Sequence, residues 1–446
     1  MGGTSQNGGV MARIIRSAAA RAAAAIAVTG ALVAWPASAL AAGPTLWVAK
    51  AATVAGNGTS CSAPGFNTIQ AAIDAAPGGA TIRVCQGSYS EQLQITSSVT
   101  IEGSGKVSVK LPASPANATT ACDTAPGTGS YQPDQDGISI CGAIRVTLTG
   151  ITVSAAWPTS TCDDSLYGIL IGGGAQVTIS KSAVSAAGAR PLNGCQGGIG
   201  IQDGMGWTTP NEAGHLVLSH SIVAGYQKNG ITVDGKGSTA RISYATVRGI
   251  GRTTQIAQNG IQVSNDAQAF ITHTTVTGNE CDVSVCGPDG LTQTQSTGLL
   301  FYGAARGSSV THSTIAANDI GVYYSADPSS GRPTRVQVLI SGDDLTRNRY
   351  EGVVLDQGRA EVTHCTISSG DVGIEILQYN GQAFGSTSIA SYDTVKLMSN
   401  STVNVMSDRA ATGDKPGSFT IGHSNIDTAP VRDHAANLPI VRFHDF

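Results

Sequence analysis

Charge is scarce in this sequence. Only 13% of its 446 residues are charged, whereas typical soluble domains have about 25%, and it contains eight lysines. Helical bundles and coiled coils are rich in Glu, Lys and Arg, so the composition excludes them. Nucleic acid is not an expected partner, because no cluster of Lys and Arg is present to neutralise phosphates.

Low charge does not indicate disorder here. Disordered chains combine low hydrophobicity with high net charge, but this chain has 41% apolar residues, a mean hydropathy of +0.04 and a net charge of −4. Glycine is abundant, with 56 residues, which is about twice the usual share. The chain is also dense in Ser, Thr, Val and Ile, which predicts a β-rich fold.

Long apolar runs are also missing, apart from one near the N-terminus. Residues 22–35 are apolar, arginines precede them, and small residues follow at 37–42. This pattern predicts a secretory signal peptide over residues 1–41. The run is too short to span a bilayer, and no other stretch approaches 18 apolar residues, so no membrane span is expected. Removal of the peptide takes away three arginines and leaves a net charge of about −7. We expect a secreted, extracellular protein.

The cysteines fit an oxidising compartment. All nine lie beyond the predicted cleavage site, and none forms the closely spaced pair of a zinc site. Sequence order suggests four disulfides, although other connectivities remain open: Cys61 with Cys85, Cys122 with Cys141, Cys162 with Cys195 and Cys281 with Cys286. Cys365 is left over. It lies in an apolar segment, where a buried, inert thiol is expected rather than a catalytic one.

Two phrases repeat along most of the chain. The first is glycine, apolar, any residue, apolar, and it recurs every 21 to 38 residues. It opens at Gly137, Gly168, Gly198, Gly230, Gly260, Gly298, Gly321, Gly352 and Gly373. The second follows each first one, as in Ile-Thr-His-Thr-Thr-Val at 271–276. Short period-2 strands at a fixed repeat indicate stacked coils, because a single coil cannot bury its apolar face.

These phrases resemble those of the pectin-lyase-like β-helix proteins, from about residue 47 to the C-terminus. The most specific part is Asn-Thr-Ile-Gln-Ala-Ala-Ile-Asp-Ala-Ala-Pro-Gly-Gly at 67–79. The resemblance implies an all-β, right-handed parallel β-helix with three strands per coil and about 10–12 coils. It also implies a short N-terminal capping helix. We expect the cap and first coils over 42–120, and β-helix repeats with a C-terminal coil and tail over 121–446.

The cap segment also reads as a helix on physical grounds. Asn67 or Thr68 is a suitable N-cap, and Pro77-Gly78 ends the pattern. Ile69, Ala72, Ile73 and Ala76 form one apolar stripe. Such a helix would cover the open end of the core, which otherwise exposes apolar side chains and unpaired backbone.

The third position of the second phrase holds five of the eight histidines. In chain order the column reads Gly150, Lys181, His220, Tyr244, His273, His312, Gly342, His364 and His423, with Tyr392 in a looser match. A metal or proton-relay ladder is one hypothesis. The column also accepts Gly, Tyr and Lys, however, which favours a turn residue with left-handed backbone, where Gly is free and His is enriched.

In the resembled family the substrate groove lies on the Gly-Ile-x-Ile face, beside the long loops. Residues two and four places after each glycine are expected to point outward there. The predicted substrate-binding residues are Gln202, Gln262, Tyr302, Tyr323, Asp356 and Glu375, with Arg252 from the loop before Gly260. Amides, carboxylates and tyrosines suit a linear polysaccharide, whose hydroxyls need both donors and acceptors.

Cleavage would require more than binding. A glycoside hydrolase needs two carboxylates, and Asp203, Asp234 and Asp266 from neighbouring coils are the predicted catalytic candidates. A lyase acting on uronates would need a basic residue, and calcium is then a possible cofactor.

Two functions of different class follow. One is a secreted lyase or hydrolase that binds and cleaves a polysaccharide of uronic-acid type. The alternative is a non-catalytic extracellular β-helix that binds glycans, adheres or has a structural role. A monomer is expected in either case.

Overall fold

The computed structural model describes residues 43–50, 56–115, 122, 135–158, 160, 162, 165–206, 212–286, 296–325, 338–356 and 360–378, and short strands between 390 and 444. Side chains are described as far as Glu375. Residues 41–446 group into one compact unit. The predicted signal peptide lies outside the described residues, and its cleavage stays a prediction.

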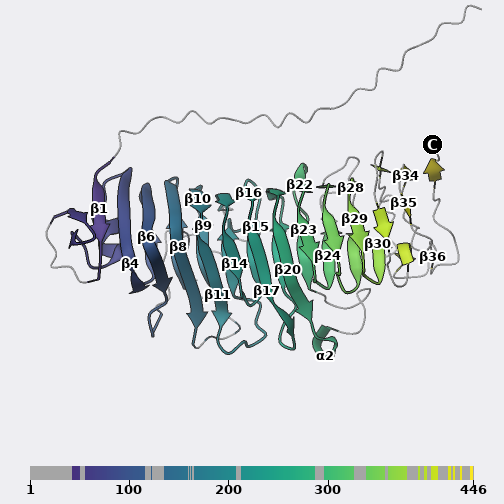
Figure 1. Cartoon of the computed structure of the whole chain (residues 1–446), viewed down its shortest axis with the longest axis horizontal. Helices are drawn as coiled ribbons and strands as arrows, with labels where there is room; N and C mark the ends of the chain where they lie inside the picture. Colours follow the sequence, from purple (N-terminus) through teal and green to yellow (C-terminus); the bar gives the residue numbers. More distant parts are fainter. Residues whose placement is uncertain are drawn as a thin grey trace, which may run out of the picture. The chain divides into compact units, whose positions relative to one another are not determined.

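Two parallel sheets contain most of the strands, and Figure 1 shows successive strands lying side by side. The twelve-stranded sheet consists of β5 (Leu93–Ile95), β7 (Gln135–Cys141), β9 (Leu166–Gly172), β12 (Ile199–Asp203), β15 (Asn229–Asp234), β18 (Asn259–Ser264), β21 (Thr297–Tyr302), β24 (Ile320–Ser325), β27 (Glu351–Asp356), β30 (Val372–Gln378), β33 (Val403–Arg409) and β36 (Arg432–Asp433). Twelve strands give twelve coils, at the upper end of the predicted range.

The twenty-stranded sheet contains the second phrases. It consists of β1 (Thr45–Val48), β4 (Ala80–Ser90), β6 (Val99–Lys110), β8 (Arg145–Trp157), β10 (Gln176–Ser180), β11 (Ala183–Ala189), β13 (His215–Ser219), β14 (Ile222–Ala224), β16 (Thr239–Ser243), β17 (Thr246–Thr253), β19 (Gln268–Thr272), β20 (Thr275–Cys281), β22 (Ser308–Thr311), β23 (Thr314–Ala316), β25 (Val338–Ser341), β26 (Asp344–Thr346), β28 (Ala360–Thr363), β29 (Thr366–Ser368), β32 (Lys396–Met398) and β35 (Asn425–Ile426).

The remaining elements are small. An antiparallel pair joins β2 (Gly58–Ser60) to β3 (Ala63–Pro64), and a parallel sheet joins β31 (Ala390–Ser391), β34 (Thr420–Gly422) and β37 (Arg442–His444). The helices are α1 (Ile69–Ala75) and α2 (Val283–Cys286).

One coil shows how the repeat is built. The chain passes from β9, which carries the Gly-Ile-x-Ile phrase, into β10 and then, after a tight turn, into β11. β9 pairs with β7 and β12 in the twelve-stranded sheet, whereas β10 and β11 pair in parallel with β13 and β14. The prediction of three strands per coil is confirmed.

Columns of β-branched residues fill the interior. Ile169, Ile201, Ile231 and Ile261 pair in register on successive strands and are fully buried, each about 4.8 Å from the next. Steric crowding explains why a glycine precedes each of these isoleucines. A Cβ atom on Gly230 would lie 2.5 Å from the carbonyl oxygen of Gly260, so only glycine fits between the coils.

The structure corrects the register of one coil. The predicted opening glycine was Gly198, but Gly200 occupies that place, because Ile201 pairs with Ile169 and Ile231. The sequence Gly198-Ile-Gly-Ile contains the pattern at two positions, two residues apart, which explains the error. As a result Gln202 takes the second position after the glycine, and Asp203 lies inside the strand rather than after it.

The left-handed turn is confirmed along the described part of the histidine column. The backbone φ is positive at every such position, from 48° at Lys181 to 70° at Gly342. The values are between 48° and 54° at the histidines His220, His273, His312 and His364. Tyr392 and His423 lie outside the described residues.

The capping helix is also confirmed. Thr68 is the N-cap, and its hydroxyl accepts the backbone N–H of Ala71 at 3.2 Å. The Glu91 carboxylate adds a second cap by accepting the N–H groups of Ile69 and Gln70 at 3.0 and 2.9 Å. Ile69 and other residues of the predicted stripe are buried against the core.

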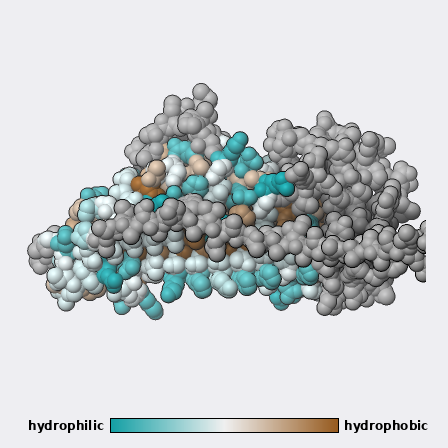
Figure 2. All heavy atoms as spheres, turned by 90° about the horizontal axis from the view of Figure 1, so that it is seen from above, coloured by the Kyte–Doolittle hydropathy of each residue, from teal (hydrophilic) through white to brown (hydrophobic). Residues whose placement is uncertain are grey.

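All four predicted disulfides are present, namely Cys61–Cys85, Cys122–Cys141, Cys162–Cys195 and Cys281–Cys286. Cys365 is a buried free thiol, as predicted, and burial raises its pKa to about 12. The visible surface in Figure 2 is mostly hydrophilic to neutral, with small apolar areas.

Candidate functional site

The outer face of the twelve-stranded sheet brings most of the predicted binding residues together. Strand pairing puts Gln262 of β18 beside Leu300 of β21, and Leu300 beside Tyr323 of β24. Two residues further along each strand, Tyr302 lies between Ser264 and Ser325. Asp356 follows Ser325 on β27. Gln262, Tyr302, Tyr323 and Asp356 therefore lie on four consecutive strands.

Aromatic and acidic groups meet at one end of this row. The Tyr323 hydroxyl and the Ser325 hydroxyl both donate to Oδ2 of Asp356, each at 3.2 Å. Tyr302 is open to solvent, with 51% of its surface exposed. The row thus offers one exposed ring beside a phenol whose position is fixed by a carboxylate.

An amide network extends the row toward β15. Asn229 Nδ2 donates to Oε1 of Gln262 at 3.0 Å and to the Thr232 hydroxyl at 2.9 Å. Asn259 Nδ2 donates to Oδ1 of Asn229 at 3.0 Å, and the Thr297 hydroxyl donates to Oδ1 of Asn259 at 2.8 Å. Neither asparagine was predicted from the sequence, although each directly precedes an opening glycine. Gln262, which is partly exposed, is held in place by this network.

Asp234 lies on the same face, but its carboxylate is occupied. Oδ1 accepts the Ser264 hydroxyl at 2.6 Å and Nδ2 of Asn265 at 2.7 Å, and Oδ2 accepts the N–H of Gly206 at 2.7 Å. The side chain is buried under the loop that follows β12. This arrangement ties the loop to β15 and β18, and it leaves little room for a reacting sugar.

Asp203 does not face the site. It pairs with Ile171 and Val233, which point into the core, and 0% of its surface is exposed. Among the described residues its carboxyl oxygens have no hydrogen-bond partner of normal geometry. Burial raises the pKa of Asp203 well above its usual range, and the nearby backbone N–H of Leu216 offsets this only in part. Substrate on the outer face cannot reach this group, so its predicted catalytic position is wrong.

Asp266 is an exposed turn residue beyond β18. Its backbone φ is +65°, and Asn265 before it has a φ of +53°. Asp and Asn tolerate this conformation, which explains the presence of both residues in the turn without a catalytic role. Of the three predicted catalytic aspartates, Asp203 is in the core, Asp234 is buried in a hydrogen-bond network and Asp266 is in an exposed turn. The structure does not bring them together on one open surface.

The other predicted binding residues are placed differently. Gln202 is on the outer face but buried, and its Nε2 donates to the carbonyl of Gly204 at 2.6 Å. Glu375 is buried beside Val354 at the far end of the row. Arg252 lies on β17 in the other sheet, where its Nε is 3.4 Å from the Glu280 carboxylate. Arg252 is therefore not part of the outer face.

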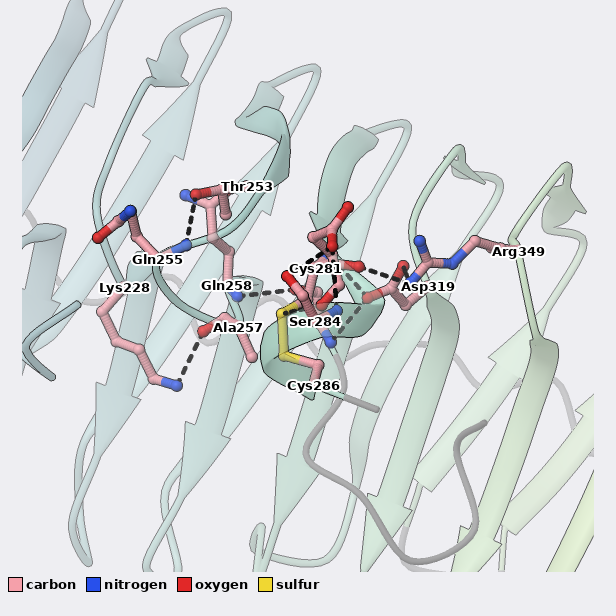
Figure 3. Close-up of a disulfide and its surroundings, with 12 residues drawn as sticks. Lys228, Thr253, Gln255, Ala257, Gln258, Cys281, Ser284, Cys286, Asp319 and Arg349 are labelled. Carbon is pink, nitrogen blue, oxygen red and sulfur yellow. Dashed lines mark hydrogen bonds and ion pairs between the residues drawn. A yellow bond between two sulfur atoms is a disulfide. The ribbon is translucent and has the colours of Figure 1, made fainter. Parts of the chain in front are cut away.

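Figure 3 shows a second cluster of polar groups, around the disulfide Cys281–Cys286. Asp319 accepts the backbone N–H of Cys281 at 2.8 Å and forms an ion pair with Arg349 at 2.9 Å. Arg349 also donates to the carbonyl of Cys281 at 2.6 Å. Burial raises the pKa of Asp319 to about 6, against the opposing effects of these hydrogen bonds and of Arg349.

Lys228 is a half-buried cation directly before β15, also visible in Figure 3. Its Nζ donates to the carbonyl of Ala257 at 3.0 Å. Among the described residues no carboxylate forms a salt bridge with it. Burial lowers the pKa of Lys228 to about 8. This lysine could not be recognised from the sequence, because its environment comes from neighbouring coils.

Comparison with known proteins agrees with this architecture. A family described as "Right handed beta helix region" matches residues 209–381. The chain is a right-handed β-helix protein. No curated protein matches its sequence.

Among solved structures, the β-helix protein is similar to the Dettilon tailspike protein, with 16% identity, a TM-score of 0.55, and coverage of 87% of this chain and 68% of that one. It is also similar to the A-module of the Azotobacter vinelandii mannuronan C-5 epimerase, with 16% identity, a TM-score of 0.53, and coverage of 89% and 98%. At such identities the likeness concerns the fold, and function has to be argued from the site.

Two further observations concern metals and membranes. In the described part of the β-helix, no group of three or more His, Cys, Asp or Glu side chains is arranged to hold a metal ion. No helix among the described residues is long and apolar enough to cross a bilayer.

Proposed function

We propose that this β-helix protein is exported and binds a linear polysaccharide of uronic-acid type along the outer face of β18, β21, β24 and β27. The observation that carries the proposal is the row of Gln262, Tyr302, Tyr323 and Asp356 on consecutive strands. At about 4.8 Å per strand the row extends about 14 Å, so it follows a chain rather than a single sugar.

The chemistry of the row fits a polyhydroxylated chain. Amides and hydroxyls can both donate and accept hydrogen bonds, and the exposed ring of Tyr302 provides an apolar face for stacking. The network from Asn229 to Gln262 orients the amide before any ligand binds, which lowers the entropy cost of association.

An acidic polymer is favoured by Lys228. A half-buried ammonium group without a salt-bridged carboxylate is destabilised, and a carboxylate from the ligand would compensate it. The epimerase that shares this fold is named for an activity on mannuronan, which is consistent with this substrate class.

Export is supported by the disulfides. Four disulfides among nine cysteines are typical of proteins from oxidising compartments. The predicted signal peptide points to the same compartment.

The proposal is for binding without cleavage by the predicted aspartates. Asp203 is inside the core, and the Asp234 carboxylate already accepts hydrogen bonds from Ser264, Asn265 and Gly206. Calcium remains a proposed cofactor for a lyase-type reaction. Comparing uronan cleavage with and without a chelator tests this role.

The test is binding of alginate, polygalacturonate and neutral dextran, measured by calorimetry and affinity electrophoresis. Tyr302→Ala should weaken uronan binding about tenfold, the size expected for loss of one aromatic contact. Tyr244→Ala is the matched control, because Tyr244 is 55% exposed but lies on the turn between β16 and β17. Lys228→Gln should reduce the preference for uronan over dextran, whereas Lys236→Gln, at an exposed position, should not.

Three results would contradict the proposal. The wild type binds none of the polymers, or Tyr244→Ala and Tyr302→Ala weaken binding equally, or ultraviolet absorbance and reducing ends rise on incubation with a uronan. The last result would restore a cleaving enzyme.

A further inference from the structure

Four aromatic rings stack on the exposed turn between the strands of the twenty-stranded sheet. The ring centroids are 5.1 Å apart from His220 to Tyr244, 4.9 Å from Tyr244 to His273 and 5.4 Å from His273 to His312. All four side chains are exposed. The glycan-binding face does not use this column, which lies on a different sheet.

The left-handed backbone keeps these side chains in register. φ is 48° at His273 and 51° at His312, so successive coils project their rings in the same direction. The two imidazole planes differ by only 10°. Beyond His312 the column continues with Gly342, which has no side chain to cover the ring; a Cβ atom there would lie 3.3 Å from Cδ2 and Nε2 of His312.

One ring nitrogen of His273 is already engaged. Nδ1 of His273 is 2.9 Å from the Thr272 hydroxyl, which orients the ring by one edge and leaves Nε2 on the other. Imidazole ligands of metal ions commonly have this second contact, from the ring nitrogen that does not bind the metal to an oxygen. Among the described residues the His312 side chain makes no hydrogen bond, and its ring is stacked on that of His273.

We propose that His273 and His312 form a two-imidazole site for a divalent transition-metal ion, with Cu²⁺ bound most tightly. Imidazole nitrogen lies about 2 Å from such ions, so the two Nε2 atoms must come within about 4 Å of each other. The ring centroids are 5.4 Å apart on exposed side chains, so rotations about χ1 and χ2 must bring the two Nε2 atoms together around the ion. Water completes the coordination. Cu²⁺ leads because it forms the most stable complexes with nitrogen ligands among these ions.

His220 does not belong to the site. Tyr244 separates it from His273 by two ring spacings, so the two imidazoles cannot reach one ion. This gives an internal control from the same column, with the same backbone conformation and an exposed ring.

The test is titration of the full chain with Cu²⁺, followed by calorimetry and by electron paramagnetic resonance of the bound ion. His273→Asn and His312→Asn are the appropriate variants, because Asn also tolerates the left-handed turn. Each single variant should lower the affinity of the strongest Cu²⁺ site at least tenfold. The double variant should bind Cu²⁺ with the same reduced affinity as either single variant, because chelation needs both rings. His220→Asn should leave the affinity within twofold. The spectrum of the wild type should show two equatorial nitrogen ligands.

A gain of binding provides the second arm. Tyr244→His puts four imidazoles in a row and should raise the number of bound Cu²⁺ ions from one to two. The proposal is overturned if the double variant binds Cu²⁺ as the wild type does, or if His220→Asn weakens binding as much as His273→Asn. Circular dichroism of each variant shows that the fold is retained, so that a lost site is not mistaken for a lost structure.

Discussion

Asn279 and Asn318 form a buried hydrogen bond between successive coils, with Nδ2 of Asn279 donating to Oδ1 of Asn318 at 2.8 Å. The same contact repeats from Asn318 to Asn348 at 3.1 Å, and the Tyr226 hydroxyl closes the other end on Asn279 at 2.5 Å. These amides are fully buried and also bond to backbone groups. The ladder therefore supports the turns that lead into the twelve-stranded sheet.

Removing the middle of this ladder should be costly. Asn318→Ala leaves buried partners on both neighbouring asparagines, and each unsatisfied group costs about 1–3 kcal/mol. We expect the free energy of unfolding to fall by about 3 kcal/mol in chemical denaturation. Asn57→Ala, at an exposed position, is the control and should change it by less than about 0.5 kcal/mol. A loss of under 1 kcal/mol for Asn318→Ala would show that the ladder is dispensable.

The buried Asp203 should make stability depend on pH. Its pKa is raised in the folded protein, so the folded state holds a proton that the unfolded state, with a pKa near 3.8, releases. Stability contributed by the protonated form is therefore lost as pH rises from about 4 toward the folded-state pKa.

Replacing Asp203 by an apolar residue like its neighbours on the adjacent strands should remove this loss of stability at higher pH. Asp203→Val copies its strand neighbour Val233, and we expect it to raise the free energy of unfolding by about 2 kcal/mol at pH 7. The gain should be smallest below pH 4, where the carboxyl is protonated in both states. Denaturation of both proteins at pH 3.5, 5 and 7 checks this. A difference that does not change with pH would mean that Asp203 is not a titrating core group.

Breaking the buried Asp319–Arg349 ion pair should destabilise the protein much more than breaking a surface ion pair. Arg349→Met leaves the buried carboxylate uncompensated, and breaking such a pair typically costs about 3–5 kcal/mol. Arg252→Met is the matched control, because the Arg252–Glu280 pair is longer and solvent-exposed, and should cost at most about 1 kcal/mol.

The pH dependence of the stability of Arg349→Met distinguishes the loss of a charge from the loss of packing. The pKa of Asp319 is about 6, so the penalty of Arg349→Met should be largest above pH 6 and should shrink below it, as the carboxyl becomes protonated. Asp319→Asn in the same chain should recover part of the loss. If the double variant is as unstable as Arg349→Met alone at pH 7, the charge is not the cause.

Features with a local cause could be predicted from the sequence. The turn column follows from the backbone preference of Gly and His, the cap from Thr68 and the apolar stripe of α1, and the repeat from period-2 phrases. The disulfides followed sequence order, because each pair joins residues within one coil or between adjacent coils.

The site was predictable only in part. Outward alternation correctly placed Gln262, Tyr302, Tyr323 and Asp356 on one face, because the side-chain period of a strand is two. The position of Asp203 was wrong for another reason: two overlapping Gly-Ile phrases left the strand end open, so Asp203 was expected after the strand, whereas it lies within β12 and faces the core.

The sequence by itself determined the fold class, the turns and the face that carries the polar row, since these depend on spacing within a coil. Only the tertiary structure decided which polar groups are available. Burial of Asp203, the network on Asp234, the contact of Lys228 with Ala257 and the stacking of His273 on His312 all arise between coils, from residues about 20 to 40 positions apart. Contacts at that separation depend on the register of each coil against the next, which loops of variable length set.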